Sequence, residues 1–584
     1  MSSTPEISYT APSRAKKLFS INHFGVLLLS VTVLLSLWQV WSVEHHATAG
    51  GKHTIRIAHW QLELGYRQAL QALIGRYNQD KAEQFAKGEI DHPVEVVQLP
   101  VTEKVYTQLI YTHLIAGTAP DIIEMGWSQA FQGTNKAEYM LPLSDIVQTP
   151  NPYNASARLP VDLPADLRQT LPKMKWKNTF VDGMLGGWDS DLQAQYGIPT
   201  CFQAFGRLSY NLDLLEQATG SRQVPETLGE LLATCRKLRE LGKRTGHDLI
   251  PIAGSQYSAY FWSGLITPFS AGWQPLLDTD RNGIVTALEG YAGWSGKRIS
   301  FTDPSQIAFA DAVQAISQQF PSGFTAMDRD AAMFLFVQGK AGVLFTGSWD
   351  AATVYSLAKF PVEIAKLPLP APGEPWGDPP RLPATEADNR AAGCFAINKR
   401  SPAIGDAIDF MQYLTGFAEN ERFNHEADWV PCIIGSHASE RMKAFQPALE
   451  GMLTASGWSP ANGDTEGGQV GSTYRGQIAS LLVNESDSAT LAKKMDEVWN
   501  DPLYGEQRFW GRAIDDARTN TRSFERTIAV QATLPLLAPG NEGATNAYRA
   551  LVTSQANKLN GAGVRILFNE TAGLLGKKFP ESSP

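Results

Sequence analysis

Apolar and polar positions follow two periods in the first third of the chain. Residues 53–59 alternate apolar and polar side chains, which predicts a strand, and residues 94–99 predict a second strand. Residues 66–78 and 101–115 place apolar side chains on one helical face, and residues 121–125 form a third short apolar run. The order strand–helix–strand–helix–strand predicts an α/β fold with a parallel sheet covered by helices.

The rest of the chain continues the mixture of strands and helices, without an internal repeat. The sequence predicts helices at 210–219, 225–241, 304–320 and 403–415 and from about 473 onward, and strands at 342–345 and 393–398. Residues 368–383 are rich in proline, which cannot donate ladder hydrogen bonds, so we expect a loop there.

A long apolar run near the N-terminus predicts one transmembrane helix. Residues 24–43 carry no charge and are long enough to cross about 30 Å of hydrocarbon. Basic residues within the preceding segment 1–23 predict that this segment is a cytoplasmic tail and that everything after the helix lies outside. We expect an uncleaved anchor in the cell inner membrane, with the body of the chain in the periplasm or outside. Cleavage after Ala49, a small residue of signal-peptidase type, remains the alternative.

Charge and cysteine content narrow the class of protein. The formal net charge is −9 and the pI is about 5.7, which argues against a nucleic-acid binder. The four cysteines show no CxxC spacing, so neither a zinc ribbon nor a thioredoxin-type motif is present. Whether these cysteines form disulfides or stay as buried thiols is left open by the sequence.

Catalytic motifs are missing from the sequence. It contains no GxGxxG, GxxxxGK[ST], HExxH or GxSxG segment, and no nucleophile, base and orienting residue can be assembled. The Asp189/Asp191 pair has the residue types of a glycosidase dyad but fits a polar loop better. We therefore expect a protein that is not an enzyme.

One acidic loop has the spacing of a calcium site. Residues 278–289 fit the pattern D-x-[DN]-x-[DN]-G-x5-E at every position. The expected ligands of a structural Ca²⁺ ion are Asp278, Asp280, Asn282, the carbonyl of Ile284, and Glu289. Because the flanks do not form a clear helix pair, we expect a structural clip and not a switch.

Several segments, taken in order, resemble a known family. They are Ile55–Trp60, Leu109–Ile123, Tyr196–Pro199, Tyr210–Asp213, Pro225–Leu231, Phe336–Trp349, Gly393–Lys399 and Ala407–Thr415 before Val430-Pro431. This series resembles the bacterial extracellular solute-binding proteins that feed ABC importers, the maltose-binding-protein-like sugar binders. The resemblance covers roughly residues 53–500.

The resemblance implies a two-lobe periplasmic-binding-protein fold of type II with an interlobe cleft. It implies crossovers near 198–205 and 393–398. Lobe one would comprise residues 53–197 and 399–440. Lobe two would comprise residues 206–392 and 441–584, including a C-terminal helical extension.

Two lines of reasoning suggest where a ligand binds. In parallel sheets, ligands bind beyond the carboxyl ends of the strands, where Trp60, Glu124 and Trp127 lie. Adding positions that match the family, the expected ligand-binding residues are Trp60, Glu124, Trp127, Tyr260, Trp349, Asp350, Trp429 and Tyr474. Trp349 resembles a sugar-stacking tryptophan of the family, with a core position as its alternative. Glu124 could equally form a structural ion pair, and Phe261 or Trp262 could replace Tyr260.

The resemblance implies a monomeric, non-enzymatic binder that delivers a sugar or oligosaccharide to ABC permease subunits in the inner membrane. The alternative is a membrane-tethered ligand sensor that signals through a partner membrane protein. The anchor, the inserted acidic loop and the long tail after residue 501 depart from the family pattern and keep this alternative open.

Overall fold

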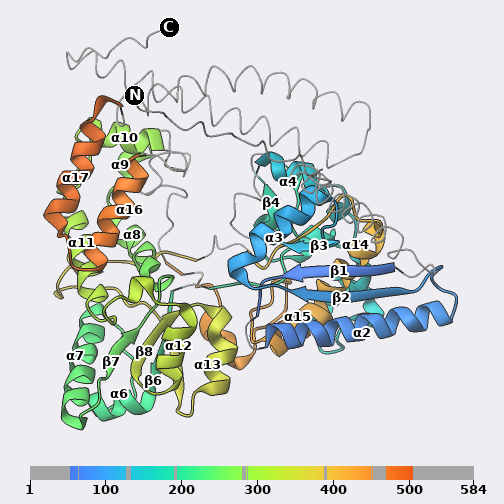
Figure 1. Cartoon of the computed structure of the whole chain (residues 1–584), viewed down its shortest axis with the longest axis horizontal. Helices are drawn as coiled ribbons and strands as arrows, with labels where there is room; N and C mark the ends of the chain where they lie inside the picture. The colour runs from blue at the N-terminus through green and yellow to red at the C-terminus, as the bar shows by residue number, and fades with distance from the viewer. Residues whose placement is uncertain are drawn as a thin grey trace, which may run out of the picture.

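The computed structural model describes residues 53–503, except 63–64, 126–132, 190–191, 193, 205, 279–284, 286, 387–390, 449 and 452–468. The described strands form two four-stranded sheets and one two-stranded ribbon. Each four-stranded sheet carries its own helices, and the two units lie side by side in Figure 1. We call them lobe one and lobe two.

Lobe one is built around the sheet β10-β3-β1-β2. Its strands are β1 (His53–His59), β2 (Val94–Pro100), β3 (Ile122–Glu124) and β10 (Phe395–Ile397), with the ribbon β4 (Trp188–Asp189) and β5 (Ala194–Gln195) beside them. Its helices are α2 (Tyr66–Ala86), α3 (Glu103–Ala116), α4 (Gly133–Tyr139), α5 (Ala165–Thr170), α14 (Ile404–Leu414) and α15 (Phe417–Ala427). Strands β1, β2 and β3 are parallel, as the sequence predicts, whereas β10 is antiparallel to β3.

Short 3-10 helices fill the irregular part of lobe one. They are η3 (Ile146–Gln148), η4 (Pro152–Asn154), η5 (Ser156–Arg158), η6 (Leu171–Lys173), η7 (Trp176–Thr179), η8 (Leu185–Gly187) and η12 (Glu440–Phe445). Met442 and Phe445 of η12 are buried in a hydrophobic cluster that contains the core of lobe one together with Ala351 and Ile364. The Tyr355 hydroxyl donates to the Arg441 carbonyl of η12 at 3.0 Å, so η12 packs where the two lobes meet. The assignment of residues from 441 onward to lobe two stays a prediction.

Lobe two is built around the sheet β7-β8-β6-β9, in which β6 is antiparallel to both neighbours. Its strands are β6 (Arg207–Asn211), β7 (Ile250–Ala253), β8 (Ala341–Thr346) and β9 (Val362–Lys366). Its helices are α6 (Leu212–Thr219), α7 (Leu228–Thr245), α8 (Ser263–Ser270), α9 (Gln274–Leu277), α10 (Ala287–Ser295), α11 (Pro304–Ser317), α12 (Arg329–Val337), α13 (Ala351–Leu357), α16 (Gln469–Leu482) and α17 (Ser488–Asn500), with η9 (Ser258–Trp262), η10 (Phe324–Ala326) and η11 (Ser348–Asp350). The predicted helix 210–219 begins only at Leu212, because Asn211 ends β6 and its side chain caps the helix.

Local signals set the ends of several helices. Thr227 caps α7 by accepting a hydrogen bond from the Glu230 amide at 3.2 Å, and Asp487 caps α17 in the same way at Thr490. Gly117 ends α3 with a left-handed backbone, φ 72°, which glycine adopts without strain.

The lobes are connected by three neighbouring segments. Ile198 bridges Phe395, Cys201 bridges Ala392, and Phe202 bridges Val430. The chain thus crosses from lobe one to lobe two through residues 198–206 and returns beside that path. All four cysteines belong to the described part and are free thiols. Cys201, Cys394 and Cys432 lie on these connecting segments, and burial raises the pKa of each.

Some predictions concern residues outside the described part. The cytoplasmic segment 1–23, the membrane helix 24–43 and the tail after residue 503 all belong there. Within the described residues, no helix has both the length and the apolar character needed to cross a membrane.

Candidate functional site

On the lobe-one side of the junction, Trp60 follows directly after β1. The Glu124 carboxylate, at the end of β3, accepts hydrogen bonds from the Trp60 amide at 3.1 Å and from Gln61 Nε2 at 2.7 Å. The Trp60 ring meets Tyr106 of α3 edge-on, with 4.9 Å between ring centroids. The Tyr106 hydroxyl lies 3.0 Å from the Glu124 carbonyl oxygen. Trp60 is therefore half-buried and held in place where two strands end.

Glu124 supports this edge from inside the lobe. Its side chain is fully buried, and its carboxylate oxygens accept the bonds from residues 60 and 61. The expectation that Glu124 accepts a ligand hydroxyl is therefore replaced by a positioning role for Trp60.

On the lobe-two side, the turn after β7 presents two tyrosines. The Ser258 hydroxyl donates to the Phe345 carbonyl at 2.8 Å and accepts from the Ser255 amide at 3.1 Å, which holds the turn against the end of β8. Tyr257 is 42% exposed and Tyr260 is 55% exposed. Tyr260 was expected from the sequence, whereas Tyr257 was missed; the aromatic residues of segment 257–262 were the only signal.

A buried aspartate positions an arginine beside this turn. Asp350 is buried, accepts a hydrogen bond from the Thr346 hydroxyl, and lies 3.7 Å from Arg329 Nε. Arg329 is the first residue of α12 and is about one quarter exposed. The structure therefore gives Asp350 a supporting role and leaves Arg329, which no sequence motif marked, as the polar group nearer the surface.

Trp349 packs where the two lobes meet. It follows β8 of lobe two and is half-buried against a hydrophobic cluster that contains the core of lobe one, Ala204 of the connecting segment and Ala351 of lobe two. A Cβ atom on Gly347 would lie 2.4–2.6 Å from three carbons of the indole ring. The indole ring of Trp349 lies over Gly347, so a larger residue at position 347 would clash with it. This packing favours the alternative interpretation of Trp349 as a core residue over that of a ring exposed for sugar stacking.

Trp429 and Tyr474 are core residues. Trp429 is 1% exposed, and its ring lies 4.6 Å from that of Tyr66, tilted by 43°. Tyr474 is 2% exposed and meets Trp262 edge-on at 6.0 Å. Neither ring has a free face for a ligand in this structure, so both expected ligand contacts are corrected to packing roles. Burial also raises the pKa of the Tyr474 hydroxyl above its ordinary value.

The lobes also touch at a rim away from the connecting segments. The Tyr257 hydroxyl lies 3.5 Å from Glu103, and Lys104 Nζ lies 3.6 Å from Asp328. Glu103 and Lys104 begin α3 of lobe one, so this helix faces lobe two (Figure 1). Partial burial, followed by the nearby Glu103 carboxylate, raises the pKa of Tyr257.

A sequence model of bacterial extracellular solute-binding proteins matches residues 67–420, more than half of the chain. The chain belongs to this family. Because the match spans elements of both lobes, the two-lobe fold is the fold of a solute-binding protein, and the predicted family is confirmed.

Solved structures of similar proteins are more distant. A protein from a study of xylan utilization by Caldanaerobius polysaccharolyticus is 19% identical, with 76% of this chain and 99% of that chain covered and a TM-score of 0.48. Maltose-bound MalE3 of T. maritima is 18% identical (76% and 98% covered, TM-score 0.47), and the GacH receptor of Streptomyces glaucescens is 14% identical (76% and 97% covered, TM-score 0.46). No curated protein sequence matches the chain.

Two predicted features of this solute-binding protein lie largely outside the described residues. Trp127 is one of them, and residues 279–284 and 286 of the acidic loop also lie outside the described part. Asp278 follows α9, and Glu289 lies in the first turn of α10, where it is buried.

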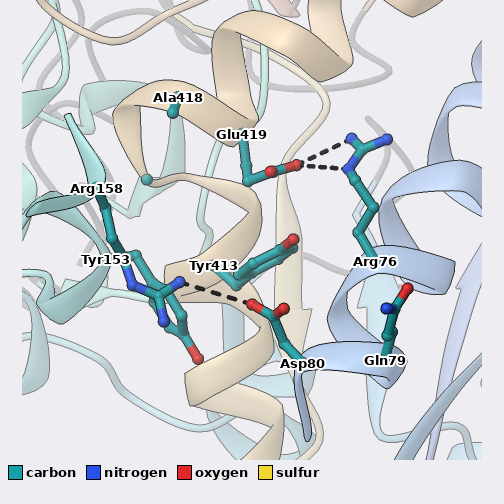
Figure 2. A pocket seen from close by; sticks show the side chains of 9 residues that line it. Arg76, Gln79, Asp80, Tyr153, Arg158, Tyr413, Ala418 and Glu419 are labelled. Carbon is teal, nitrogen blue, oxygen red and sulfur yellow. Dashed lines mark hydrogen bonds and ion pairs between the residues drawn. The ribbon is translucent and has the colours of Figure 1, made fainter. Parts of the chain in front are cut away.

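The solute-binding protein also has a hollow of about 340 Å³ in lobe one (Figure 2). It is lined by Arg76, Gln79, Asp80, Tyr153, Arg158, Tyr413, Gly416, Ala418 and Glu419. Arg76 pairs with Glu419 at 2.9 Å and Arg158 with Asp80 at 3.7 Å. Both arginines of the hollow therefore have carboxylate partners, as Arg329 has beside the turn after β7.

Proposed function

We propose that the chain binds a sugar or an oligosaccharide between its lobes and delivers it, unchanged, to the permease of an ABC transporter. The family supports solute binding outside the cytoplasm. The observation that carries the sugar class is the set of aromatic rings on both sides of the junction: Trp60 on lobe one, and Tyr257 and Tyr260 on lobe two. Aromatic faces stack on the apolar faces of sugar rings, and a few polar groups such as Arg329 fix orientation.

Trp60 is held by neighbouring side chains, whereas the two tyrosines lie on a turn, so we assign them different roles in binding. Trp60 is held by Tyr106 and by the Glu124 hydrogen bonds, so it offers a rigid platform at little entropic cost. Tyr257 and Tyr260 lie on a turn of the other lobe and would meet the solute as the lobes approach. A solute that contacts both lobes favours the closed arrangement by its differential affinity.

The test begins with a thermal-shift screen of the full chain against maltose, raffinose, acarbose and xylo-oligosaccharides. A ligand present at 100 times its Kd stabilises the folded state by about 2.7 kcal/mol. Affinity for the best saccharide is then measured by calorimetry for Trp60→Ala. We expect a loss of about 1–3 kcal/mol, by analogy with base stacking on aromatic rings.

Phe85→Ala is the matched control, because Phe85 is an exposed aromatic ring near the end of α2. It should bind like the parent. If no saccharide shifts the melting temperature, the sugar class is wrong. Cleavage of the bound saccharide, detected by chromatography, would reject delivery without turnover.

We also propose that residues 24–43 anchor the chain in the inner membrane and that the binding lobes act as a monomer outside the cytoplasm. The support is the uncharged apolar run and the basic residues before it. Membrane fractionation should recover the full-length chain with the membranes. A mature protein that begins at Gly50 would instead identify a cleaved signal peptide.

For the acidic loop we propose a structural Ca²⁺ ion, supported by the ligand spacing of residues 278–289. Binding to the folded state alone stabilises it, so EDTA should lower the melting temperature and calcium should restore it. Glu289→Gln should abolish this response. An EDTA-insensitive parent would show that the loop is acidic without binding calcium.

A further inference from the structure

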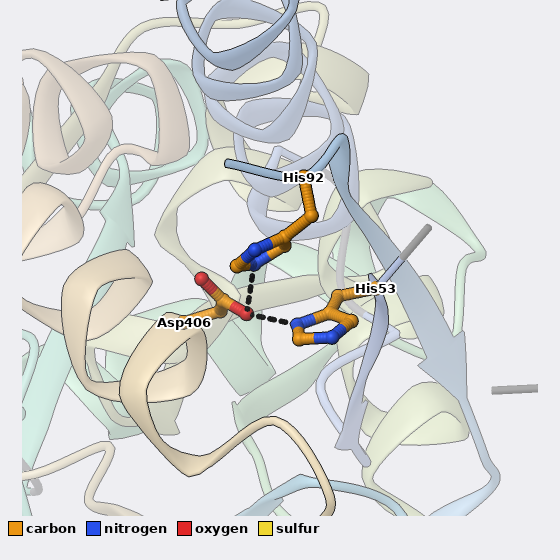
Figure 3. Close-up of side chains that lie close together, drawn as sticks. All are labelled: His53, His92 and Asp406. Atoms are coloured by element: carbon orange, nitrogen blue, oxygen red, sulfur yellow. Dashed lines mark hydrogen bonds and ion pairs between the residues drawn. The ribbon is translucent and has the colours of Figure 1, made fainter. Parts of the chain in front are cut away.

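Three side chains of metal-ligating type, shown in Figure 3, lie together where β1 begins, whereas Trp60 follows the other end of this strand. His53 begins β1, His92 lies two residues before β2, and Asp406 lies in the first turn of α14. Strand β1 pairs in parallel with β2, with His53 beside Val94, so the two histidines meet at the amino edge of the sheet. A strand of seven residues spans about 20 Å, which separates this group from the lobe junction.

Both histidines approach the same carboxylate oxygen of Asp406. His53 Nδ1 lies 2.6 Å and His92 Nε2 lies 3.1 Å from the same Oδ2 of Asp406. The two imidazole rings lie 3.9 Å apart, tilted by 40°. One ligand atom from each residue lies within 4.8 Å of the others, and this is the only such group of three in the described residues.

We propose that His53, His92 and Asp406 bind a divalent transition-metal ion of the Zn²⁺ class. Imidazole nitrogen and carboxylate oxygen are ligands that zinc, nickel and copper accept, and zinc binds them at about 2.0–2.2 Å. Three protein ligands leave a coordination position for water.

The surroundings permit an ion to enter. The three side chains are only partly buried: those of His53, His92 and Asp406 are 26%, 34% and 21% exposed. Solvent, and therefore an ion, can reach them. An ion binds neutral imidazoles and balances the aspartate charge.

The ion would join parts of the chain that are far apart in sequence. Asp406 lies 353 residues after His53 and 314 after His92. Binding only to the folded state, the ion stabilises the attachment of the first strand to α14. This role is structural and does not depend on the proposed sugar site.

The experiment uses the full-length chain without a polyhistidine tag, made metal-free with a chelator that is then removed. Zn²⁺ is titrated by calorimetry, and Co²⁺ by its visible absorption as a spectroscopic substitute. The parent should bind one Zn²⁺ at this site and melt at a higher temperature with it. His92→Ala and Asp406→Asn should each weaken this binding at least tenfold and remove the thermal shift.

His437→Ala is the matched control, since His437 also lies near a carboxylate, with its Nδ1 3.8 Å from Glu421, but outside the three-residue group. It should bind Zn²⁺ like the parent. His92→Gln, which keeps a hydrogen-bonding side chain, replaces His92→Ala if circular dichroism shows unfolding. Parent affinity in both site variants, or no Zn²⁺ binding by the parent, would overturn the proposal and leave a histidine–aspartate hydrogen-bond network.

Discussion

The connecting segments and the rim join the same two lobes in different ways. Beside the crossover, Ser348 of lobe two donates its amide to the Ala204 carbonyl at 2.8 Å and accepts from the Ala204 amide at 3.1 Å, and both residues are buried. At the rim, Lys104 and Asp328 are 3.6 Å apart, with side chains 82% and 63% exposed. Exposed pairs of this kind contribute about 0–1 kcal/mol, whereas buried hydrogen bonds are costly to break. The difference indicates a fixed hinge and a rim that opens easily.

The largest effect should come from the ion pair at the hinge end of β6. Arg207 is buried, and its guanidinium makes two hydrogen bonds of 2.9 Å to Glu386 and one of 3.0 Å to the Ala444 carbonyl. Arg207→Met should lower the free energy of unfolding by about 3–5 kcal/mol, because it leaves a partly buried carboxylate without its main partner. Urea unfolding measures this change.

Arg222→Met is the control for that variant. Arg222 also pairs with two carboxylates, at 2.8 and 2.9 Å, but half of its side chain is exposed. It should lose no more than about 1 kcal/mol. If both variants lose the same free energy of unfolding, burial does not make the Arg207 pair more stabilising than an exposed pair.

The Arg207–Glu386 pair should also make the free energy of unfolding depend on pH in the acidic range. Although burial opposes ionisation, hydrogen bonds from Arg207 and from the Ala448 amide lower the pKa of Glu386 from 4.5 to about 2. Because the pKa is lowered in the folded state, its stabilisation is fully present above pH 4.5 and is lost as the pH falls toward 2. The stability difference between the parent and Glu386→Gln should shrink across this range. A difference that stays constant from pH 7 to pH 2.5 would contradict the assignment.

A smaller effect should follow from filling the space under Trp349. Gly347→Ala puts a methyl group against the indole ring and should cost about 1–3 kcal/mol, measured by thermal unfolding. Gly264→Ala is the control, because a Cβ there meets no atom within 4 Å and alanine favours helix α8. If Gly347→Ala weakens saccharide binding with unchanged stability, Trp349 contacts the ligand and is not only a packing residue.

The smallest effect should be at the rim. A double-mutant cycle of Lys104→Ala and Asp328→Ala should give a coupling energy of about 0–1 kcal/mol that decreases with salt. Small-angle scattering of the ligand-free double variant should show a radius of gyration at least as large as that of the parent. A coupling above 2 kcal/mol would mean that the rim locks the lobes and that the contrast with the hinge is wrong.

Local periodicity predicted much of lobe one, because its first strands and helices are continuous segments with clear caps. The strand at His53–His59 was predicted at its observed position. The antiparallel pairing of β10 with β3 was not predicted, since pairing between distant segments leaves no local pattern.

The candidate site was predicted less well for the same reason. Trp60 was identified because it follows a strand, but a sequence does not show which aromatic side chains pack inward, so Trp429 and Tyr474 were assigned to the wrong environment. Arg329 was missed because its place depends on Asp350, which lies on another element. Asp406 was missed because it meets its histidines only in the folded lobe.

The late return of the chain to the first sheet has a consequence for biosynthesis. Strand β10 lies about 270 residues after its partner β3. At synthesis rates of about 5–20 residues per second, roughly 15–55 s pass after β3 is made before the sheet can close. Such distant pairing also slows folding itself. Until β10 arrives, the edge of β3 that it covers has no strand partner, so the first sheet stays incomplete while lobe two is being made.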